Sequence, residues 1–438
     1  MRPPGTRFLL FPQPPFLKGF EEPEVVEVSS PAGSVGPGPS DDRMYAVYPY
    51  DKRVTYGAKV GPRGEKFAPP WTGPIFPPAR PGPGGHFDHL EVGSPEFESA
   101  HLFGSVRFVL DVWESYFERP INWHFGDIYE RMELAIMPRF PNATMGYGFM
   151  EIGGYHMPNG GYRPFSLNFD VLGHEVGHSI IYPIIGLPDP TRVTDDYYGF
   201  HESAADMVGL IASLHFDSVV DRLLENTSGN LYSLNRLNRI AELSHNHQIR
   251  VVANRCTLWD FADGWESEHD LGLPMSAAIF DTFVDLFHES LKARGVISAE
   301  TARLSDALEY HPEYHERLQD DFHRAYADHP EEMRVALLEA RDFIGSYMAA
   351  SFAKLTPRLD YADVAATLME AEREVSGGHY ASILGHNLAR RGIGHVRVGP
   401  RLTPPDDDSH AFSARTDTLI PPCRARGHRH KKLPEGAS

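Results

Sequence analysis

The chain of 438 residues is poor in cysteine and has no long apolar run. Its two cysteines, Cys256 and Cys423, are too few for a fold held together by several disulfides. A membrane-spanning helix needs about 18 consecutive apolar residues, and no such segment occurs. Prolines interrupt the short apolar patch at residues 8–11, so we recognise no secretory signal and expect a cytoplasmic protein.

Positive charge is also scarce in this sequence. The chain has 41 Lys and Arg residues against 60 Asp and Glu residues, which gives a formal net charge of −19. Nucleic acid and anionic lipid surfaces repel a chain of this charge. We therefore expect neither a nucleic-acid partner nor a membrane partner, and the sequence carries no signal of an oligomeric state.

Proline is concentrated near the N-terminus. About half of the 37 prolines lie in the first 100 residues, and the densest stretch is 62–83. Proline has no backbone N–H, which excludes a regular helix or a central strand there. We expect residues 1–85 to form a proline-rich arm that lies over a surface or acts as a linker. Within it, the aromatic and β-branched content of 43–60 favours a short hairpin, with a partly disordered arm as the alternative.

The pattern changes after this arm. Residues 86–168 combine a helical segment at 100–120 with Gly- and aromatic-rich stretches typical of strands, which predicts a β-containing lobe. Residues 169–397 show apolar residues at helical spacing and predict a mostly helical lobe. Residues 398–438 have no core pattern and are expected to be a disordered tail. The helices expected in the helical lobe include 169–185, 199–213, 274–294, 298–310, 313–328, 330–353 and 360–375.

The first candidate for chemistry is the HEVGH segment inside an apolar predicted helix. Helix positions i and i+4 are offset by about 40°, so His174 and His178 face the same way and can bind one zinc ion. Glu175 lies about 100° further round the helix than His174, beside the metal. There it can take a proton from a zinc-bound water. A buried helix with two hydrogen-bonded histidines is the alternative interpretation.

The next predicted helix supplies a candidate third ligand. A hydrolytic zinc site uses three protein ligands and a water, and Glu202 lies in the HESAAD segment of that helix. Asp206 is one turn further on the same face, where it can accept the second ring N–H of a ligand histidine. His201 is a rival ligand, which we rank below Glu202 because it points to another side of the helix.

HExxH followed by ExxxD on the next helix resembles the thermolysin-like zinc metallopeptidases, the gluzincin group. The resemblance covers roughly residues 98–395. It implies an α+β fold of two lobes, a β-containing N-terminal lobe and a mostly α-helical C-terminal lobe, with the zinc helix between them. It also implies an endopeptidase with one zinc ion per chain, bound by His174, His178 and Glu202, and with Glu175 as the general base.

The resemblance implies roles for residues around the cleft as well. The segment PNATMGYGFMEIGG is similar to the family's Asn-Ala strand, which hydrogen-bonds the substrate backbone, so Asn142 and Ala143 become substrate contacts. The segment QIRVVANR places Arg250 at the family's cleft arginine. The segment HDLGLPMSAAIFD is similar to the stretch that carries a histidine stabilising the transition state, and His269 matches it.

The sequence departs from the family's pattern at several places, two of which concern the tyrosine and the calcium site. Asp189 stands where the stabilising tyrosine is expected, in a loop that is longer here, so Tyr197 and Tyr198 are both candidates for that role. The family's paired-calcium site uses an acid matched by Asp170, but Ser213 stands where a second acid is needed. Calcium binding is therefore in doubt.

Three functions follow from these residues. The first is a zinc metalloendopeptidase acting on a peptide or protein, in which Glu175 activates the water and His269 helps to stabilise the oxyanion. The second is a catalytically inactive, zinc-stabilised binding or scaffold protein, favoured by the altered tyrosine loop and disfavoured by Glu175. The third is a zinc hydrolase acting on a peptide's N-terminal residue or on a small amide.

Overall fold

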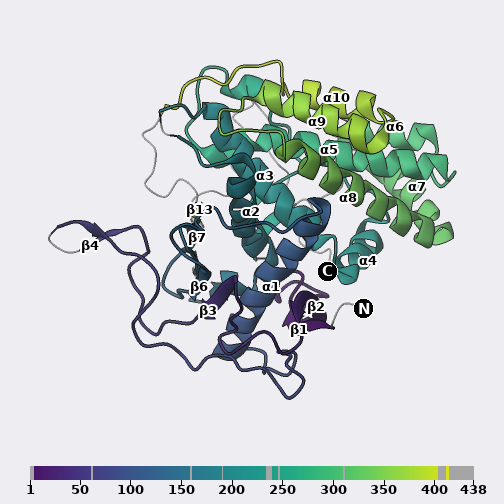
Figure 1. Ribbon diagram of the computed structural model, residues 1–438. Coiled ribbons are helices and arrows are strands. Elements are labelled where there is room, and N and C mark those ends of the chain that lie inside the picture. The colour runs from purple at the N-terminus through teal and green to yellow at the C-terminus, as the bar shows by residue number, and fades with distance from the viewer. Residues whose placement is uncertain are drawn as a thin grey trace.

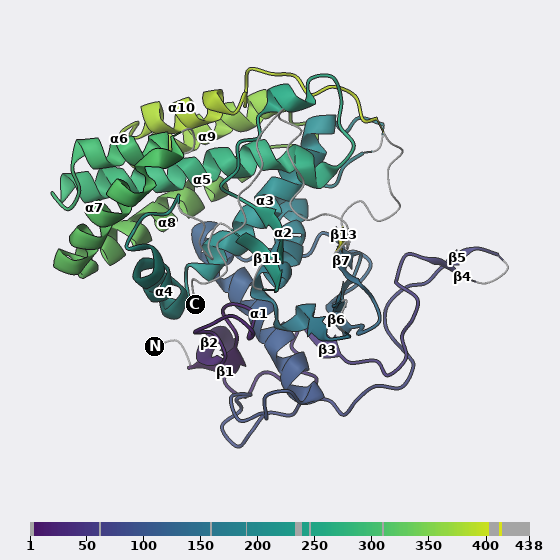
Figure 2. The ribbon, with the colours of Figure 1, turned by 180° about the vertical axis from the view of Figure 1, so that it is seen from behind.

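The computed structural model has an α+β fold, with a sheet-containing N-terminal region and a helical C-terminal region (Figure 1). Seen from behind, the strands β3, β6 and β7 lie below the long helices, and helix α1 runs between the two regions (Figure 2). The structure describes residues 4–60, 63–157, 160–189, 191–232, 239–244, 247–308, 311–402 and 411–413.

The first strands of the chain pack against helix α1 (Pro95–Tyr116). Strand β1 (Gly5–Leu10) pairs antiparallel with β2 (Glu24–Pro31), and Phe8 of β1 is fully buried. Gly104 of α1 lies under β1, since a Cβ there would meet the Phe8 side chain at 2.9 Å. The segment expected as a proline-rich arm thus contributes to the core, while the domain boundaries expected from the sequence stay predictions.

The main sheet has five strands in the order β13-β7-β8-β6-β3. Strand β6 (Met132–Ile136) pairs in parallel with β3 (Met44–Val47) on one side and with β8 (Phe149–Ile152) on the other. Strand β7 (Asn142–Gly146) pairs antiparallel with β8. Strand β13 (Ala411–Ser413) pairs antiparallel with β7, so a segment from near the C-terminus completes the sheet.

The hairpin predicted within residues 43–60 is not formed. Its first half is β3, which pairs with β6, and its second half, β4 (Lys59–Val60), pairs with β5 (Glu65–Lys66). The buried carboxylate of Glu133 explains the difference, because it accepts hydrogen bonds from the hydroxyls of Tyr45 at 2.9 Å and Tyr56 at 2.6 Å. Tyr45 and Tyr56 therefore both contact β6.

Helices α2 (Phe169–Ile185) and α3 (Asp195–Ser213) form the centre of the molecule, and both are predicted by the sequence. Asn168 caps α2 by accepting the N–H of Val171 at 3.4 Å, and Thr194 caps α3 by accepting the N–H of Tyr197 at 3.2 Å. These caps satisfy backbone donors that a helix start leaves without a partner in the helix.

Small residues bring α2 and α3 into backbone contact. A Cβ on Gly173 would lie 2.7 Å from the Cα of Gly209, and one on Gly177 would lie 2.7 Å from the Cα of Ala205. Real Cβ atoms do not approach other carbons so closely, so neither glycine can be replaced without moving one helix. This contact fixes the distance between the two helices that carry the candidate ligands.

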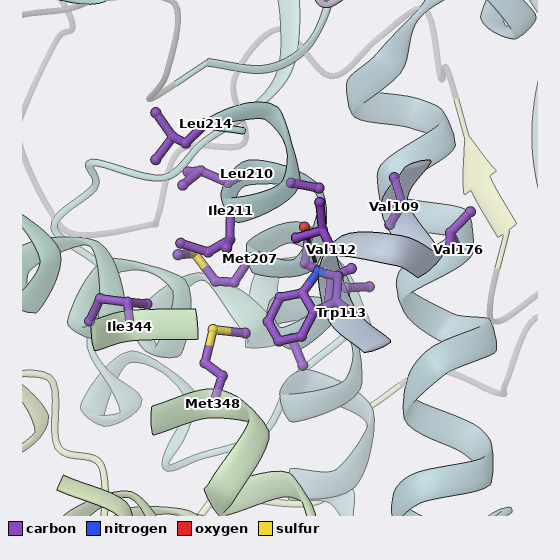
Figure 3. Packing of buried hydrophobic residues seen from close by; sticks show 14 of the residues in the cluster. Val109, Val112, Trp113, Val176, Met207, Leu210, Ile211, Leu214, Ile344 and Met348 are labelled. Carbon is purple, nitrogen blue, oxygen red and sulfur yellow. Dashed lines mark hydrogen bonds between the residues drawn. The ribbon is translucent and has the colours of Figure 1, made fainter. Parts of the chain in front are cut away.

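Apolar side chains from α1, α2, α3 and α8 (Pro330–Phe352) form one cluster with Trp113, which is fully buried (Figure 3). The indole N–H of Trp113 donates to the carbonyl of Val208 at 3.2 Å, so its polar atom is satisfied within the core. This cluster joins α1 to the helical region. The labelled apolar neighbours are Val109, Val112, Val176, Met207, Leu210, Ile211, Leu214, Ile344 and Met348.

Helix α5 (Glu268–Ala293) packs against α3, α8 and α10 (Ala381–Arg390), and α9 (Tyr361–Ser376) covers α8 (Figure 2). Within the described residues, no helix combines the length and apolarity needed to cross a bilayer. The remaining elements are β9 (Gly154–His156), β10 (Tyr162–Pro164), α4 (Asp217–Thr227), β11 (Arg239–Ser244), β12 (His247–Val251), α6 (Ala299–Ala307), α7 (His315–Asp328) and three short 3-10 helices, Phe165–Leu167, Leu258–Phe261 and Pro312–Tyr314.

Candidate metal centre

Three buried side chains from α2 and α3 converge on one point. The Nε2 atoms of His174 and His178 lie 3.0 Å apart. The carboxylate of Glu202 lies 3.5 Å from His174 Nε2 and 3.7 Å from His178 Nε2. All three residues are at most 2% exposed, and their ligand atoms lie within 4.8 Å of one another. This group could therefore bind a metal ion.

The geometry of the ring nitrogens fits a metal ion. Zinc binds nitrogen and carboxylate oxygen at about 2.0–2.2 Å, so ligand atoms around one tetrahedral ion lie roughly 3.3–3.5 Å apart. The observed separations of 3.0–3.7 Å bracket that value. A carboxylate beside His174 Nδ1 assigns the ring proton to that nitrogen, which leaves the Nε2 lone pair directed to the cluster.

The acceptor of the His174 ring proton is Asp206. Its Oδ1 atom lies 2.7 Å from His174 Nδ1, and its side chain is buried one turn after Glu202 on α3. Such a contact fixes the orientation of a ligand histidine and increases its basicity. The structure thus brings Asp206 to the position that the helical spacing predicts.

His201 contacts His178 on the side of the ring that faces away from His174. Its Nδ1 lies 2.8 Å from His178 Nδ1, on the ring nitrogen that faces away from His174. Its ring lies 4.8 Å from that of His178 and nearly parallel to it. His201 is therefore placed to orient His178 as Asp206 orients His174. From the sequence, His201 is only a rival ligand, and its contact with His178 is not predicted.

His269, at the start of α5, contacts the carboxylate of Glu202. Its Nδ1 lies 2.5 Å from Glu202 Oε2, and its side chain is 27% exposed, in contrast to the fully enclosed ligand histidines. Burial alone would raise the pKa of Glu202, but the imidazoles of His269, His178 and His174 outweigh it and hold that pKa well below its usual range. The carboxylate of Glu202 is thus kept ionised.

The two candidate tyrosines lie in different environments. Tyr197 is fully buried, and its hydroxyl donates to the carbonyl of Gly186 at 3.1 Å, which directs it to the end of α2. Tyr198 is partly buried, with its ring 6.0 Å from that of Trp265. A third tyrosine, Tyr182, lies one turn after His178; it is buried, and its ring lies 4.4 Å from that of His201. Tyr182 is not among the residues predicted from the sequence, although its i+4 spacing from His178 is the signal that could have found it.

A second acid lies next to the centre. Glu268 precedes His269 and forms an ion pair with Arg401 at 2.8 Å. Burial, and then the negative charge of Glu202, raise the pKa of Glu268 to about 7.

Arg401 falls in the segment expected to begin a disordered tail, yet its guanidinium lies 4.7 Å from the ring centre of Trp265. Residues 403–410 and 414–438 of that predicted tail lie outside the described residues.

The predicted substrate contacts lie on β7, which packs against α2. Ala143 is fully buried, and its N–H is held by the side chain of Asn142 at 3.0 Å. The backbone of Arg250 belongs to β12, whereas its side chain lies outside the described residues.

The acid matched to the family's calcium site, Asp170, accepts a hydrogen bond from the Gln13 amide at 3.1 Å. Ser213, which stands in place of the second acid, donates to the carbonyl of Leu210 at 2.8 Å. Calcium binding at this position therefore stays in doubt.

Comparison with known proteins finds a likeness among solved structures. No protein-family model and no curated protein matches the chain. Among solved structures, the chain is similar to the precursor of protealysin, a metalloproteinase from Serratia proteamaculans. The identity is 12%, the match covers 74% of this chain and 83% of that chain, and the TM-score is 0.43.

Proposed function

We propose that the protein is a zinc-dependent metalloendopeptidase. The observation that carries the proposal is the buried group of His174, His178 and Glu202, with the glutamate Glu175 in the same turn of α2. A purely structural metal site has no use for a second buried glutamate at that position. The contact between His174 and Asp206 also supports the proposal, because a ligand whose outer nitrogen is already bonded is held ready for a metal.

The reaction would use residues of both helices and of α5. His174, His178 and Glu202 would hold the zinc ion, which when bound polarises a water and lowers its pKa. Glu175 accepts a proton from the attacking water and returns it to the nitrogen of the leaving amine, so that the broken C–N bond yields a free amine and a carboxylate. His269, the exposed member of the group, donates a hydrogen bond to the oxygen that becomes negative.

Substrate would bind as an extended strand along the outer edge of β7. An extended peptide that adds to a sheet edge gains backbone hydrogen bonds whatever its side chains are. In this chain, Ala411–Ser413 already pair antiparallel with Asn142–Thr144 on that edge. The pairing supports Asn142 and Ala143 as contacts for an extended peptide, and it means that β13 and a substrate compete for the same strand.

Breaking β13 is expected to lower KM. Proline at position 412 removes a backbone donor and disfavours strand pairing opposite Ala143, so Phe412→Pro should free the edge of β7. If β13 covers the edge half of the time, the apparent KM for a peptide should fall about twofold, and further at higher occupancy, with kcat unchanged. Steady-state kinetics on a quenched peptide measures this, with Ala425→Pro as the control. An unchanged KM would show that β13 does not compete with substrate.

Removal of the metal tests the proposed function directly. Protein dialysed against a chelator is expected to lose cleavage of a quenched peptide library, and one equivalent of zinc should restore it. Circular dichroism of the depleted protein is the control for folding. Zinc uptake with no cleavage of any peptide would favour the scaffold function instead. Cleavage restricted to peptides with a free N-terminus would favour an aminopeptidase-like enzyme.

A further inference from the structure

A second group of metal-ligand side chains lies in the helical region. Asp285 and His288 of α5 and Asp306 of α6 have ligand atoms within 4.8 Å of one another. Asp285 and His288 are three residues apart, so they share a face of α5, and Asp306 comes from the end of α6. Sixteen residues of helix separate Asp285 from His269, or about 24 Å at 1.5 Å per residue, so this group is distinct from the first centre.

Among the described residues, neither ring nitrogen of His288 has a hydrogen-bond partner, although the residue is only 2% exposed. Its ring packs near those of Phe287 and Phe322, with centroids 5.9 and 5.8 Å away. A buried polar atom normally has a partner, because leaving it without one costs free energy. The Nδ1 atom instead faces Asp306 Oδ1 at 3.7 Å, which is too long for a hydrogen bond.

This separation matches those of the first centre. Glu202 lies 3.5 and 3.7 Å from its two histidines, the spacing expected of ligand atoms that share one ion. The imidazole of His288 and the carboxylate of Asp306 are thus spaced as co-ligands and not as a hydrogen-bonded pair.

The carboxylates of Asp285 and Asp306 belong to the same group of ligand atoms, within 4.8 Å of one another. The Asn387 amide donates to Asp285 Oδ2 at 2.7 Å, which fixes the orientation of the carboxylate. The guanidinium of Arg391 is bound to another acid, Asp281, at 2.7 Å. The side chain of Asp306 is 48% exposed, which gives an ion a route from solvent.

We propose that Asp285, His288 and Asp306 form a second binding site for a divalent transition-metal ion. One imidazole and two carboxylates are a mixed donor set that suits zinc or manganese, with water completing the shell on the exposed side. An ion bound there fastens α6 to α5. The proposal does not depend on the peptidase function or on the first centre.

Equilibrium dialysis against Zn²⁺ tests the site. Asp306→Ala removes an exposed ligand without disturbing the core, and Asp320→Ala removes an exposed acid of α7 as the matched control. We expect the wild type and Asp320→Ala to bind one more zinc ion per chain than Asp306→Ala. If the first centre does not bind zinc, the number of bound zinc ions falls equally in all three proteins, and the difference between them remains. Equal counts in all three proteins would overturn the proposal and leave His288 and Asp306 as a plain ion pair.

Thermal unfolding provides a second measurement. Zinc at 100 times its dissociation constant lowers the apparent unfolding constant about 100-fold for each site that only the folded state offers. The rise in Tm on adding Zn²⁺ should therefore be smaller for Asp306→Ala than for Asp320→Ala. His288→Gln, which keeps the size of the side chain but offers a weak ligand, should behave like Asp306→Ala. Equal rises in all variants would contradict a second site.

Discussion

Replacing Glu175 by glutamine is expected to reduce the rate of peptide hydrolysis by about 10²–10⁴-fold while the zinc content stays at the wild-type level. General acid–base catalysis by a positioned side chain contributes a factor of this size. Glutamine has nearly the same shape as glutamate, so the packing of α2 is kept, but it cannot accept the proton of the attacking water. Metal analysis of the purified variant and kcat/KM on a quenched peptide are the measurements.

A matched control is available in α9. Glu372 is also fully buried, and its carboxylate accepts the N–H of Tyr380 at 2.8 Å, far along the chain from the candidate centre. Glu372→Gln tests whether loss of a buried carboxylate lowers activity through the fold alone. Hydrolysis by Glu175→Gln at the wild-type rate would remove Glu175 from the mechanism, whatever the zinc content.

Replacing Gly177 by alanine should weaken both the fold and the metal site. The added Cβ would lie 2.7 Å from the Cα and 3.0 Å from the carbonyl oxygen of Ala205, and backbone atoms cannot turn aside. Overpacking of this kind costs about 1–3 kcal/mol in the free energy of unfolding. Helix α3 also carries Glu202 and Asp206, so we expect the zinc dissociation constant to rise by roughly 10–100-fold, as when the support of a ligand is lost.

The control for this exchange is another helical glycine with room beside it. A Cβ on Gly385 of α10 would meet only the flexible side chain of Met369, at 3.6 Å. Gly385→Ala should leave zinc affinity unchanged and raise stability by up to about 1 kcal/mol, because alanine favours helix. Urea unfolding and zinc titration measure both quantities. If Gly177→Ala is as stable as Gly385→Ala and binds zinc as tightly, the result contradicts the close contact between α2 and α3.

The sequence predicts the helices of the centre well, because the information is local. Spacing of four residues places His174 and His178 on one face of α2, and the same spacing places Glu202 and Asp206 on one face of α3. The close contact between α2 and α3 is harder to predict from the sequence, because a small residue in a helix does not always mark a packing contact.

Contacts between segments far apart in the chain could not be predicted in this way. Strand β3 pairs with β6, which lies 88 residues later, and strand pairing of this kind leaves no periodic signal in either segment. The role of His201 depends on which nitrogen of His178 it meets, and that is set by the crossing of α2 and α3. The direction of Tyr197 similarly depends on where α2 ends, at Gly186.

The backbone contact between α2 and α3 has a consequence for how a metal is loaded. Because Gly173, Gly177, Ala205 and Gly209 hold the helices together, the ligand positions are set by carbon packing and not by the ion. If the group binds a metal ion, the two helices hold the ligand side chains in place whether or not the ion is bound, so that loading requires no refolding of the chain.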